Sequence, residues 1–333
     1  MTTPHAFGEP PKAARKHHEH NHHGIVVQDP YAWLQDPNYP TVNDQEILDY
    51  LQDENRYFEQ YMAPKQEFVD TLFKELKGRK SDSDESVPYF HNGYHYQWRF
   101  NEGDQYRRWY RAAGSHEHEQ IDPRDWVTLL DENALATDQD YFRLGAMSVS
   151  PNNQFIAYSI DTDGGERFTL HVIDLTNGIA VTSPITHTIG EAIWNQHSDG
   201  LLYRNVNEQW RPDKIYWRKL HDDQADTLIC AEEDGGFFLS MHLSQSEQLV
   251  FLRSADHVTS EVSYLPIDDF SATPVMISPR SSGHEYDVEH YQDQLLIRSN
   301  LRQPNFDLFT APLSAHSQAQ WQPFLEGDDN HYL

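Results

Sequence analysis

A unit of short strands and polar turns recurs along most of the sequence at a nearly constant period. The stretch MSVSPNNQFIAYS places a polar turn before alternating apolar residues, and stretches of the same kind follow three more times. Their apolar strands centre on Tyr158, Tyr203, Phe251 and Ile297, at spacings of 45, 48 and 46 residues. Several short strands per unit and a period in the forties are typical of a β-propeller. A sandwich or barrel gives shorter, less regular spacing, so we predict a mainly β propeller fold.

An earlier unit of this type begins near Val87, where the hydrophobic period changes from 3.6 to 2 residues. The dipeptide Asn92-Gly93 joins two alternating stretches and is a strong hairpin signal. A third strand is expected over residues 105–114. Counted from here, we expect about five blades in residues 81–333. Either the ring closes at five blades, or the sequence stops before a larger ring closes.

Residues 1–80 follow a different pattern and are predicted to form a separate N-terminal region. Residues 1–30 are rich in Pro, His, Lys and Gly, without periodicity, and are expected to be an extended arm. Apolar residues then recur at three- and four-residue spacing, which predicts a helix over 43–62 that Asn43 or Asp44 caps. A second helix is expected after Pro64, with Gly78 as its end.

The charge of the chain limits its partners. Its formal net charge is -28, with 53 acidic and 25 basic residues. Such a surface repels phosphate backbones and anionic lipids, so nucleic acid and membrane surfaces are not expected partners. Basic peptides would be favoured, although the charge can equally serve only to keep the protein soluble.

The sequence also bears on location. Cys230 is the single cysteine, so an intrachain disulfide is excluded, which fits a reducing compartment. The first residues lack an apolar signal core, and no run approaches the roughly 18 apolar residues of a membrane span. A cytoplasmic location is therefore the expectation.

Catalytic and metal motifs are weak. The histidines between His17 and His23 could bind a metal, but no spaced Cys or carboxylate set completes a ligand shell, so we predict no metal and no cofactor. The nucleophile elbow Gly-x-Ser-x-Gly is absent. Ser282 precedes Gly283, but Arg280 stands where the elbow needs its first glycine. We therefore assign no catalytic residue.

The order and spacing of several stretches resemble the prolyl oligopeptidase family of serine peptidases, most closely its oligopeptidase B members. PPKAARK, then HG and DPYAWLQD, is similar to the family's N-terminal arm, and YLQDENRYFEQYM to its helix. The segment Leu144–Gly178 is similar to one of its blades. The resemblance implies a two-domain enzyme, in which a seven-bladed propeller covers an α/β-hydrolase domain.

What the resemblance implies for function goes beyond this sequence. Oligopeptidase B cleaves short peptides after Arg or Lys, and its propeller limits access by size. The catalytic residues of the family lie after the propeller, and about five of seven blades are present here. The chain is therefore expected to be a non-catalytic portion, with short basic peptides as substrates of the full enzyme and the missing hydrolase domain as its partner.

The stretch DTDGGERF, Asp161–Phe168, carries the one candidate site. In the family, a charged residue in this loop region helps to latch the propeller to the catalytic domain. Glu166 or Arg167 is the corresponding interdomain latch candidate. The alternative is a solvated charged hairpin without a partner.

Two other functions stay open at this point. A five-bladed propeller glycosidase would place paired carboxylates at the central funnel, but no acidic residue recurs at equivalent positions in successive units. A stand-alone binding propeller without chemistry is the second alternative. Its repeats lack a signature dipeptide such as Trp-Asp.

Overall fold

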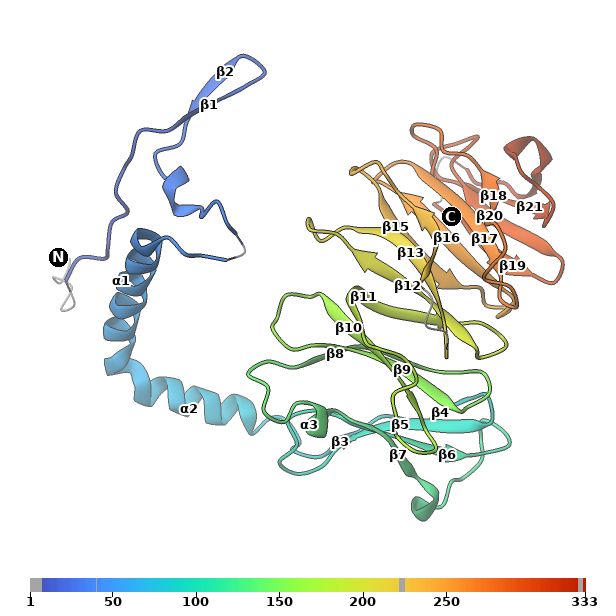
Figure 1. Cartoon of the computed structure of the whole chain (residues 1–333), viewed down its shortest axis with the longest axis horizontal. Helices are drawn as coiled ribbons and strands as arrows, with labels where there is room; N and C mark the ends of the chain where they lie inside the picture. The colour runs from blue at the N-terminus through green and yellow to red at the C-terminus, as the bar shows by residue number, and fades with distance from the viewer. Residues whose placement is uncertain (1–7, 40, 222–224, 329–331) are drawn as a thin grey trace. The chain divides into compact units, whose positions relative to one another are not determined.

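The computed structural model describes residues 8–39, 41–221, 225–328 and 332–333. The chain divides into two compact units, Met1–Asp82 and Ser83–Leu333. The first contains the two long helices, and the second is built almost entirely from strands (Figure 1).

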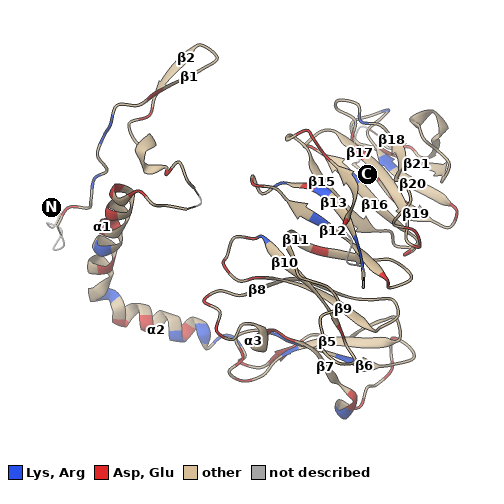
Figure 2. Ribbon diagram, in the orientation of Figure 1, with Lys and Arg blue, Asp and Glu red and all other residues tan. Residues whose placement is uncertain are grey.

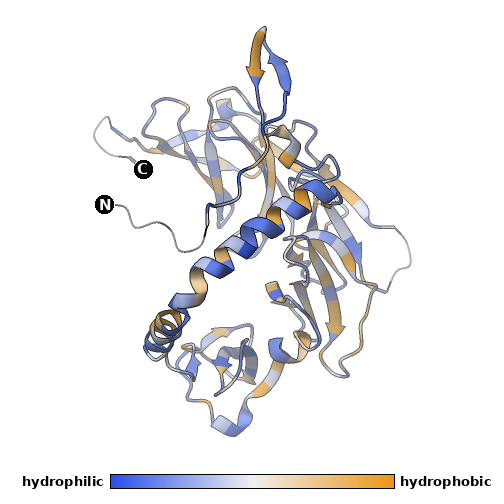
Figure 3. Ribbon diagram, turned by 90° about the vertical axis from the view of Figure 1, so that its left-hand side faces the viewer, coloured by the Kyte–Doolittle hydropathy of each residue, from blue (hydrophilic) through white to orange (hydrophobic). Residues whose placement is uncertain are grey.

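The N-terminal arm contains a β-hairpin. Strands β1 (Glu19–His22) and β2 (Ile25–Gln28) pair antiparallel around a two-residue turn. His23 and Gly24 both have positive φ, at 55° and 82°, which is the backbone conformation of a type I′ turn. The sequence analysis expected an extended arm here and did not predict the pairing of these two strands. Figure 3 shows the polar β1 in blue beside the apolar β2 in orange.

Two helices follow the short 3₁₀ turn Ala32–Leu34, as predicted. Helix α1 (Gln45–Met62) begins at Asp44, whose carboxylate accepts hydrogen bonds from the backbone N–H groups of Glu46 and Ile47. A 3₁₀ turn, Ala63–Lys65, stands where Pro64 interrupts the pattern, and α2 (Gln66–Lys77) ends at Gly78. Across the described ranges, no helix is both long and apolar enough to cross a membrane.

The apolar side chains of these helices are largely exposed. Phe58, Phe68 and Phe73 are 62%, 69% and 64% exposed. Ile47 is the one buried hydrophobic residue among the described residues of this unit. Acidic residues, in red, recur along α1 (Figure 2). The helices are therefore amphipathic, and within their own unit the apolar face lacks a covering layer.

The second unit consists of antiparallel sheets in which consecutive strands are neighbours, except that β3 and β4 both pair with β5. The first sheet contains β3 (Asp84–Glu85), β4 (Tyr89–His91), β5 (Tyr94–Phe100), β6 (Arg108–Ala113) and β7 (Val127–Asp131), which the short helix α3 (Glu132–Leu135) follows. The second contains β8 (Arg143–Val149), β9 (Phe155–Asp161), β10 (Phe168–Asp174), β11 (Ile185–Trp194), β12 (Gly200–Val206), β13 (Pro212–Lys219) and β14 (Thr227–Ala231).

Two four-stranded sheets complete the unit. One contains β15 (Phe238–Leu243), β16 (Leu249–Ala255), β17 (Ser260–Pro266) and β18 (Val275–Ser278). The other contains β19 (Tyr286–Tyr291), β20 (Gln294–Ser299), β21 (Asp307–Pro312) and β22 (Gln322–Leu325). Short 3₁₀ turns lie at Pro123–Asp125 and Gln318–Gln320.

The repeat seen in the sequence has a structural counterpart. Tyr158, Tyr203, Phe251 and Ile297 lie on β9, β12, β16 and β20, each of which is the second strand of its repeat. The predicted hairpin is also present, because β4 and β5 pair around Asn92-Gly93. The period of the sequence is therefore the period of the strand groups.

Strand β11 is shared between two repeats. Its first half pairs with β10, at Ile185 with Leu170, and its second half pairs with β12, at Ala192 with Tyr203. Gly190 lies between the halves with φ of +97°, and a Cβ there would lie 3.0 Å from Ser159 Oγ. Only glycine fits this bend without strain. As a result, two repeats form one seven-stranded sheet.

The hydrophobic core lies between successive strand groups. Tyr96 of β5 packs with Ile156 of β9, and Leu202 of β12 belongs to one cluster with Leu239 of β15. Another cluster joins β16 and β17 to β19–β21 and includes Phe251. Sheets that bury both faces against their neighbours in chain order are what a propeller requires. The number of blades, five of a probable seven, stays a prediction.

Candidate functional site

The loop between β9 and β10 is built around Asp161. Its carboxylate accepts hydrogen bonds from the backbone N–H groups of Asp163, Gly164 and Glu166, at 2.9–3.0 Å. Burial alone would raise the pKa of Asp161, but these backbone hydrogen bonds outweigh it and hold the pKa below its usual range. The loop that carries both latch candidates is therefore held by an ionised carboxylate.

Glu166 reaches outward from this loop. Its carboxylate pairs with Arg143 at the start of β8, at 2.9 Å, and both side chains are exposed. An exposed pair of this kind contributes about 0–1 kcal/mol and exchanges its partner easily. Glu166 is therefore free to pair with a cation presented by another domain.

Arg167 is held inside the propeller unit. Its guanidinium donates to the backbone carbonyls of Asn207 and Glu208, at 3.2 and 2.9 Å, and lies 4.0 Å from the ring centroid of Trp210. The Trp210 indole N–H in turn donates to Gly165 O at 2.6 Å. These contacts tie the β9–β10 loop to the β12–β13 loop. The two candidates thus differ: Arg167 links repeats, whereas Glu166 faces outward.

The sequence analysis did not find a cavity beside the first sheet. Its volume is about 580 Å³, and its walls come from β4–β6, α3 and β8. The aromatic side chains that line it are Tyr89, Phe100, Tyr106 and Trp109. Glu132 also lines it and is only 7% exposed. Its carboxylate accepts a hydrogen bond from the Trp109 indole N–H at 2.7 Å.

Burial dominates the ionisation of this carboxyl group. It raises the pKa of Glu132, although the hydrogen bond from Trp109 and the positive charge of Arg107 act in the opposite direction. A perturbed carboxylate that lines a cavity is a candidate for a functional group. In the sequence, Glu132 was one acidic residue among many, and only its place beside Trp109 distinguishes it.

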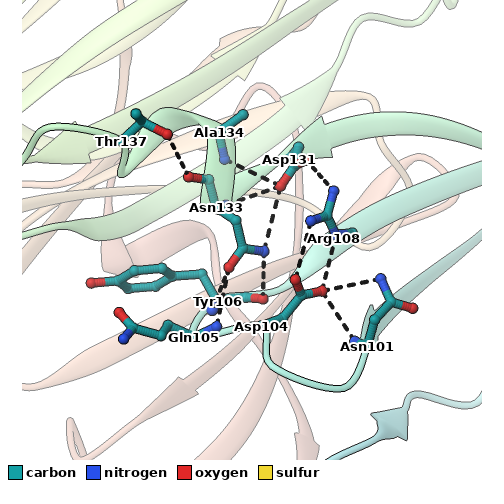
Figure 4. Close-up of polar contacts among 9 residues, drawn as sticks. All are labelled: Asn101, Asp104, Gln105, Tyr106, Arg108, Asp131, Asn133, Ala134 and Thr137. Atoms are coloured by element: carbon teal, nitrogen blue, oxygen red, sulfur yellow. Dashed lines mark hydrogen bonds and ion pairs between the residues drawn. The ribbon is translucent and has the colours of Figure 1, made fainter.

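A polar network holds the two segments next to this cavity. Asn133 Oδ1 accepts from the backbone N–H groups of Gln105 and Tyr106, at 3.1 and 3.0 Å, and its amide donates to Tyr106 O. Arg108 lies between Asp104 and Asp131 and forms ion pairs with both (Figure 4). Loop 101–106 and helix α3 are therefore fixed to one another.

Further cavities lie along the first strands of successive repeats. One of about 270 Å³ is lined by β8, β11 and β15, including Glu191 and His242. Another, of about 670 Å³, extends from these strands to the turns after them. At its edge His91 Nδ1 lies 4.0 Å from Glu247 Oε1.

The remaining candidates from the sequence are placed as follows. His20 and His22 lie on β1 with ring centroids 4.8 Å apart. Within the described part of the chain, no group of three or more His, Cys, Asp or Glu could hold a metal ion. Cys230 is half-buried, and burial raises the pKa of its thiol, so it is a poor nucleophile.

Two serine–histidine contacts occur. Ser246 Oγ lies 2.7 Å from His290 Nδ1, and Ser299 Oγ lies 2.8 Å from His284 Nε2. In the described ranges neither histidine meets a carboxylate on its other ring nitrogen, as the base of a catalytic triad would. Neither contact has the geometry of a nucleophile site.

The fold and the comparisons agree on the class of protein. The structure is similar to that of oligopeptidase B from Leishmania major, with a TM-score of 0.86 at 23% identity, over 96% of this chain and 46% of that one. Oligopeptidase B from Trypanosoma brucei, solved with covalently bound antipain in a closed form, gives a TM-score of 0.85. The fold is that of a β-propeller with an N-terminal helical segment.

Sequence comparisons define the family. Residues 10–333 match the family described as prolyl oligopeptidase, N-terminal beta-propeller domain. Protease 2 of Moraxella lacunata is 32% identical over 307 residues, 91% of this chain and 44% of the relative. Dipeptidyl aminopeptidase BI of Pseudoxanthomonas mexicana is 28% identical, over 98% of this chain and 47% of the relative. The chain belongs to the prolyl oligopeptidase family and spans about half the length of these relatives.

Proposed function

We propose that this chain is the N-terminal arm and propeller portion of an oligopeptidase B-like serine endopeptidase that cleaves short peptides after Arg or Lys. The observation that carries the proposal is the family match over residues 10–333, with relatives about twice as long. The net charge of -28 supports basic substrates. The family match also favours a peptidase over a propeller glycosidase. With a single cysteine, the chain suits a reducing compartment, and we propose a cytoplasmic location.

In this proposal the propeller limits access by size. The cavities along β8, β11 and β15 support the passage of an extended peptide rather than a folded protein. The exposed apolar face of α1 and α2, with Phe58, Phe68 and Phe73, would pack against the remainder of the enzyme. Glu166 would form the interdomain ion pair that favours the closed state.

The test uses this chain alone and in a chimera. The propeller portion of Moraxella lacunata Protease 2 is replaced by residues 1–333 of this chain, and the rest of the relative is kept. We expect no hydrolysis of an Arg-aminomethylcoumarin reporter by the chain alone. The chimera should cleave this reporter and short Arg-containing peptides, but not folded proteins. Hydrolysis by the chain alone, or digestion of folded proteins by the chimera, would show that the proposal is wrong.

The latch is tested in the same chimera. Glu166→Gln removes the charge without changing the size of the side chain, and Glu102→Gln is the matched control in an exposed loop. We expect Glu166→Gln to raise the fraction of open molecules in small-angle scattering and to lower kcat/KM for the reporter. Equal scattering and equal kcat/KM of the two variants would mean that Glu166 is a solvated residue without an interdomain partner.

A further inference from the structure

Glu132 is a buried carboxylate that forms no direct ion pair with the described residues. It is 7% exposed, and one of its oxygens accepts the Trp109 indole N–H. Throughout the described ranges, no basic side chain comes within 4.0 Å of its oxygens. A buried charge with a single neutral hydrogen bond is costly to maintain, and folded proteins normally pair it. The carboxylate also lines an open cavity, so a cation from outside can reach it.

The walls of this cavity suit a cation as well. Four of the lining side chains are aromatic, and aromatic faces attract guanidinium and ammonium groups. The cavity, at about 580 Å³, has the size of a small-ligand site and exceeds what one side chain fills. Gln105 at the rim adds an uncharged hydrogen-bonding group.

Arg107 also lines the cavity. Its guanidinium lies 4.8 Å from the ring centroid of Trp98 and 6.0 Å from that of Trp109. Its charge lowers the pKa of Glu132 and so helps to keep the carboxylate ionised. Among the described residues Arg107 forms no direct ion pair with Glu132, so an oxygen of this carboxylate is left for a second cation.

The walls of this cavity are held in place by polar contacts within the chain. The hydrogen bonds of Asn133 to residues 105 and 106, and the ion pairs of Arg108 with Asp104 and Asp131, fix loop 101–106 against α3 (Figure 4). Binding therefore costs little ordering of the protein. Glu132 itself begins α3, directly after Asp131, and its backbone N–H donates to Arg107 O at 3.1 Å.

We propose that this cavity binds the cationic group of a peptide, with Glu132 pairing with a guanidinium or ammonium group and the aromatic walls packing around it. The site would hold a basic residue of a substrate at the propeller. The inference rests on the proposed function only in taking a peptide as the ligand.

The test is a titration of the 333-residue chain by calorimetry at low salt. The probes are acetyl-Ala-Arg-Ala-amide, the same peptide with citrulline in place of arginine, and Ala-Ala-Ala-amide with a free amino terminus. Citrulline keeps the shape of arginine and removes its charge. We expect the arginine peptide to bind at least about tenfold more tightly than the citrulline peptide. Binding by Ala-Ala-Ala-amide instead would assign the site to an N-terminal ammonium group.

Two variants assign the binding to Glu132. Glu132→Gln keeps an acceptor for Trp109 and removes the charge, and Glu102→Gln makes the same change in the neighbouring exposed loop. Only Glu132→Gln should weaken binding, and quenching of tryptophan fluorescence by the arginine peptide should be lost with it. Equal binding of arginine and citrulline peptides, or no binding of any probe, would overturn the proposal. The citrulline comparison needs no variant, so it holds if Glu132→Gln does not fold.

The two proposals can fail separately. A chimera that cleaves peptides while the chain does not distinguish arginine from citrulline would refute the cation site alone. A chain that binds arginine peptides through Glu132, within a chimera that has no activity, would support the site and leave the peptidase assignment without support.

Discussion

The two units of this chain differ in how far their apolar side chains are buried. In Ser83–Leu333, large side chains such as Phe251 and Tyr286 are fully buried between successive sheets. In Met1–Asp82, phenylalanines of α1 and α2 are more than 60% exposed. Short helices gain most of their stability from tertiary packing. The strand unit therefore carries its own core, whereas the described residues of the helical unit bury a single hydrophobic side chain, Ile47.

The largest difference between the units is expected from the same substitution in each. Phe251→Ala removes a fully buried ring and should lower the free energy of unfolding by about 3–5 kcal/mol. Phe68→Ala removes an exposed ring and should change it by less than about 0.5 kcal/mol. Urea unfolding followed by tryptophan fluorescence measures both. A cost for Phe68→Ala close to that of Phe251→Ala would abolish the contrast.

The pH dependence of stability should also divide between the units. Burial lowers the pKa of His284, which is held by Ser299 and Gln318. The unfolded state, with an ordinary pKa of about 6.5, then binds a proton more readily than the folded state. The free energy of unfolding should therefore fall as pH decreases below about 7, by at most about 1.4 kcal/mol per pH unit for this group.

Variants locate this effect. His284→Gln should flatten the slope of urea-unfolding stability between pH 7.5 and 5.5, because it removes the titrating group. His22→Gln, on the exposed β1, should leave the slope unchanged. If the slope is the same in His284→Gln as in the unmodified chain, burial of this imidazole does not govern the acid response.

Cation–aromatic contacts offer a smaller contrast. Arg167→Ala breaks two hydrogen bonds and the contact with Trp210, and should cost about 1 kcal/mol. Lys16 lies 4.4 Å from the Trp33 ring centroid and pairs with Glu46, but these groups are exposed. Lys16→Ala should cost less than about 0.5 kcal/mol in the same unfolding assay. The reverse order would mean that the arm contributes more to stability than the loop contact.

The smallest effect on the stability of the strand unit is expected from deletion of the whole N-terminal unit. Deletion of residues 1–82 should shift the thermal midpoint of the strand unit by less than about 2 °C, because all its core residues lie after Asp82. Differential scanning calorimetry of the shortened and full chains measures the shift. A drop of about 5 °C or more would contradict the independence of the two units.

Periodic signals of the sequence predicted most of the fold. The spacing of Tyr158, Tyr203, Phe251 and Ile297 located the second strand of each repeat, because these buried strands carry short apolar runs that follow polar turns. Asp44 marked the start of α1 because its carboxylate accepts hydrogen bonds from the first turn, and Gly78 marked the end of α2, where its φ is -65°. The β1–β2 hairpin was missed because neither of its strands alternates in hydrophobicity. The sharing of β11 between two repeats depends on tertiary pairing, and the one sign of it in the sequence is Gly190, at the bend of the strand.

The candidate site was predicted less completely. The charged loop pointed to Glu166 and Arg167 together, and only the structure separates them, because the partners of Arg167 lie some 40 residues downstream. Glu132 had no signal at all. It is buried beside Trp109 of β6, and such contacts between distant segments are not encoded in local spacing.

The sharing of β11 has a consequence for how the molecule opens. Most neighbouring repeats are held together by side-chain packing, so one sheet can separate from the next without breaking backbone hydrogen bonds. Across β10, β11 and β12 the backbone ladder is continuous, so neither sheet half can detach without breaking amide hydrogen bonds of the other. The amide protons of these strands should therefore exchange together, because the strands open as one cooperative block, separately from the other sheets.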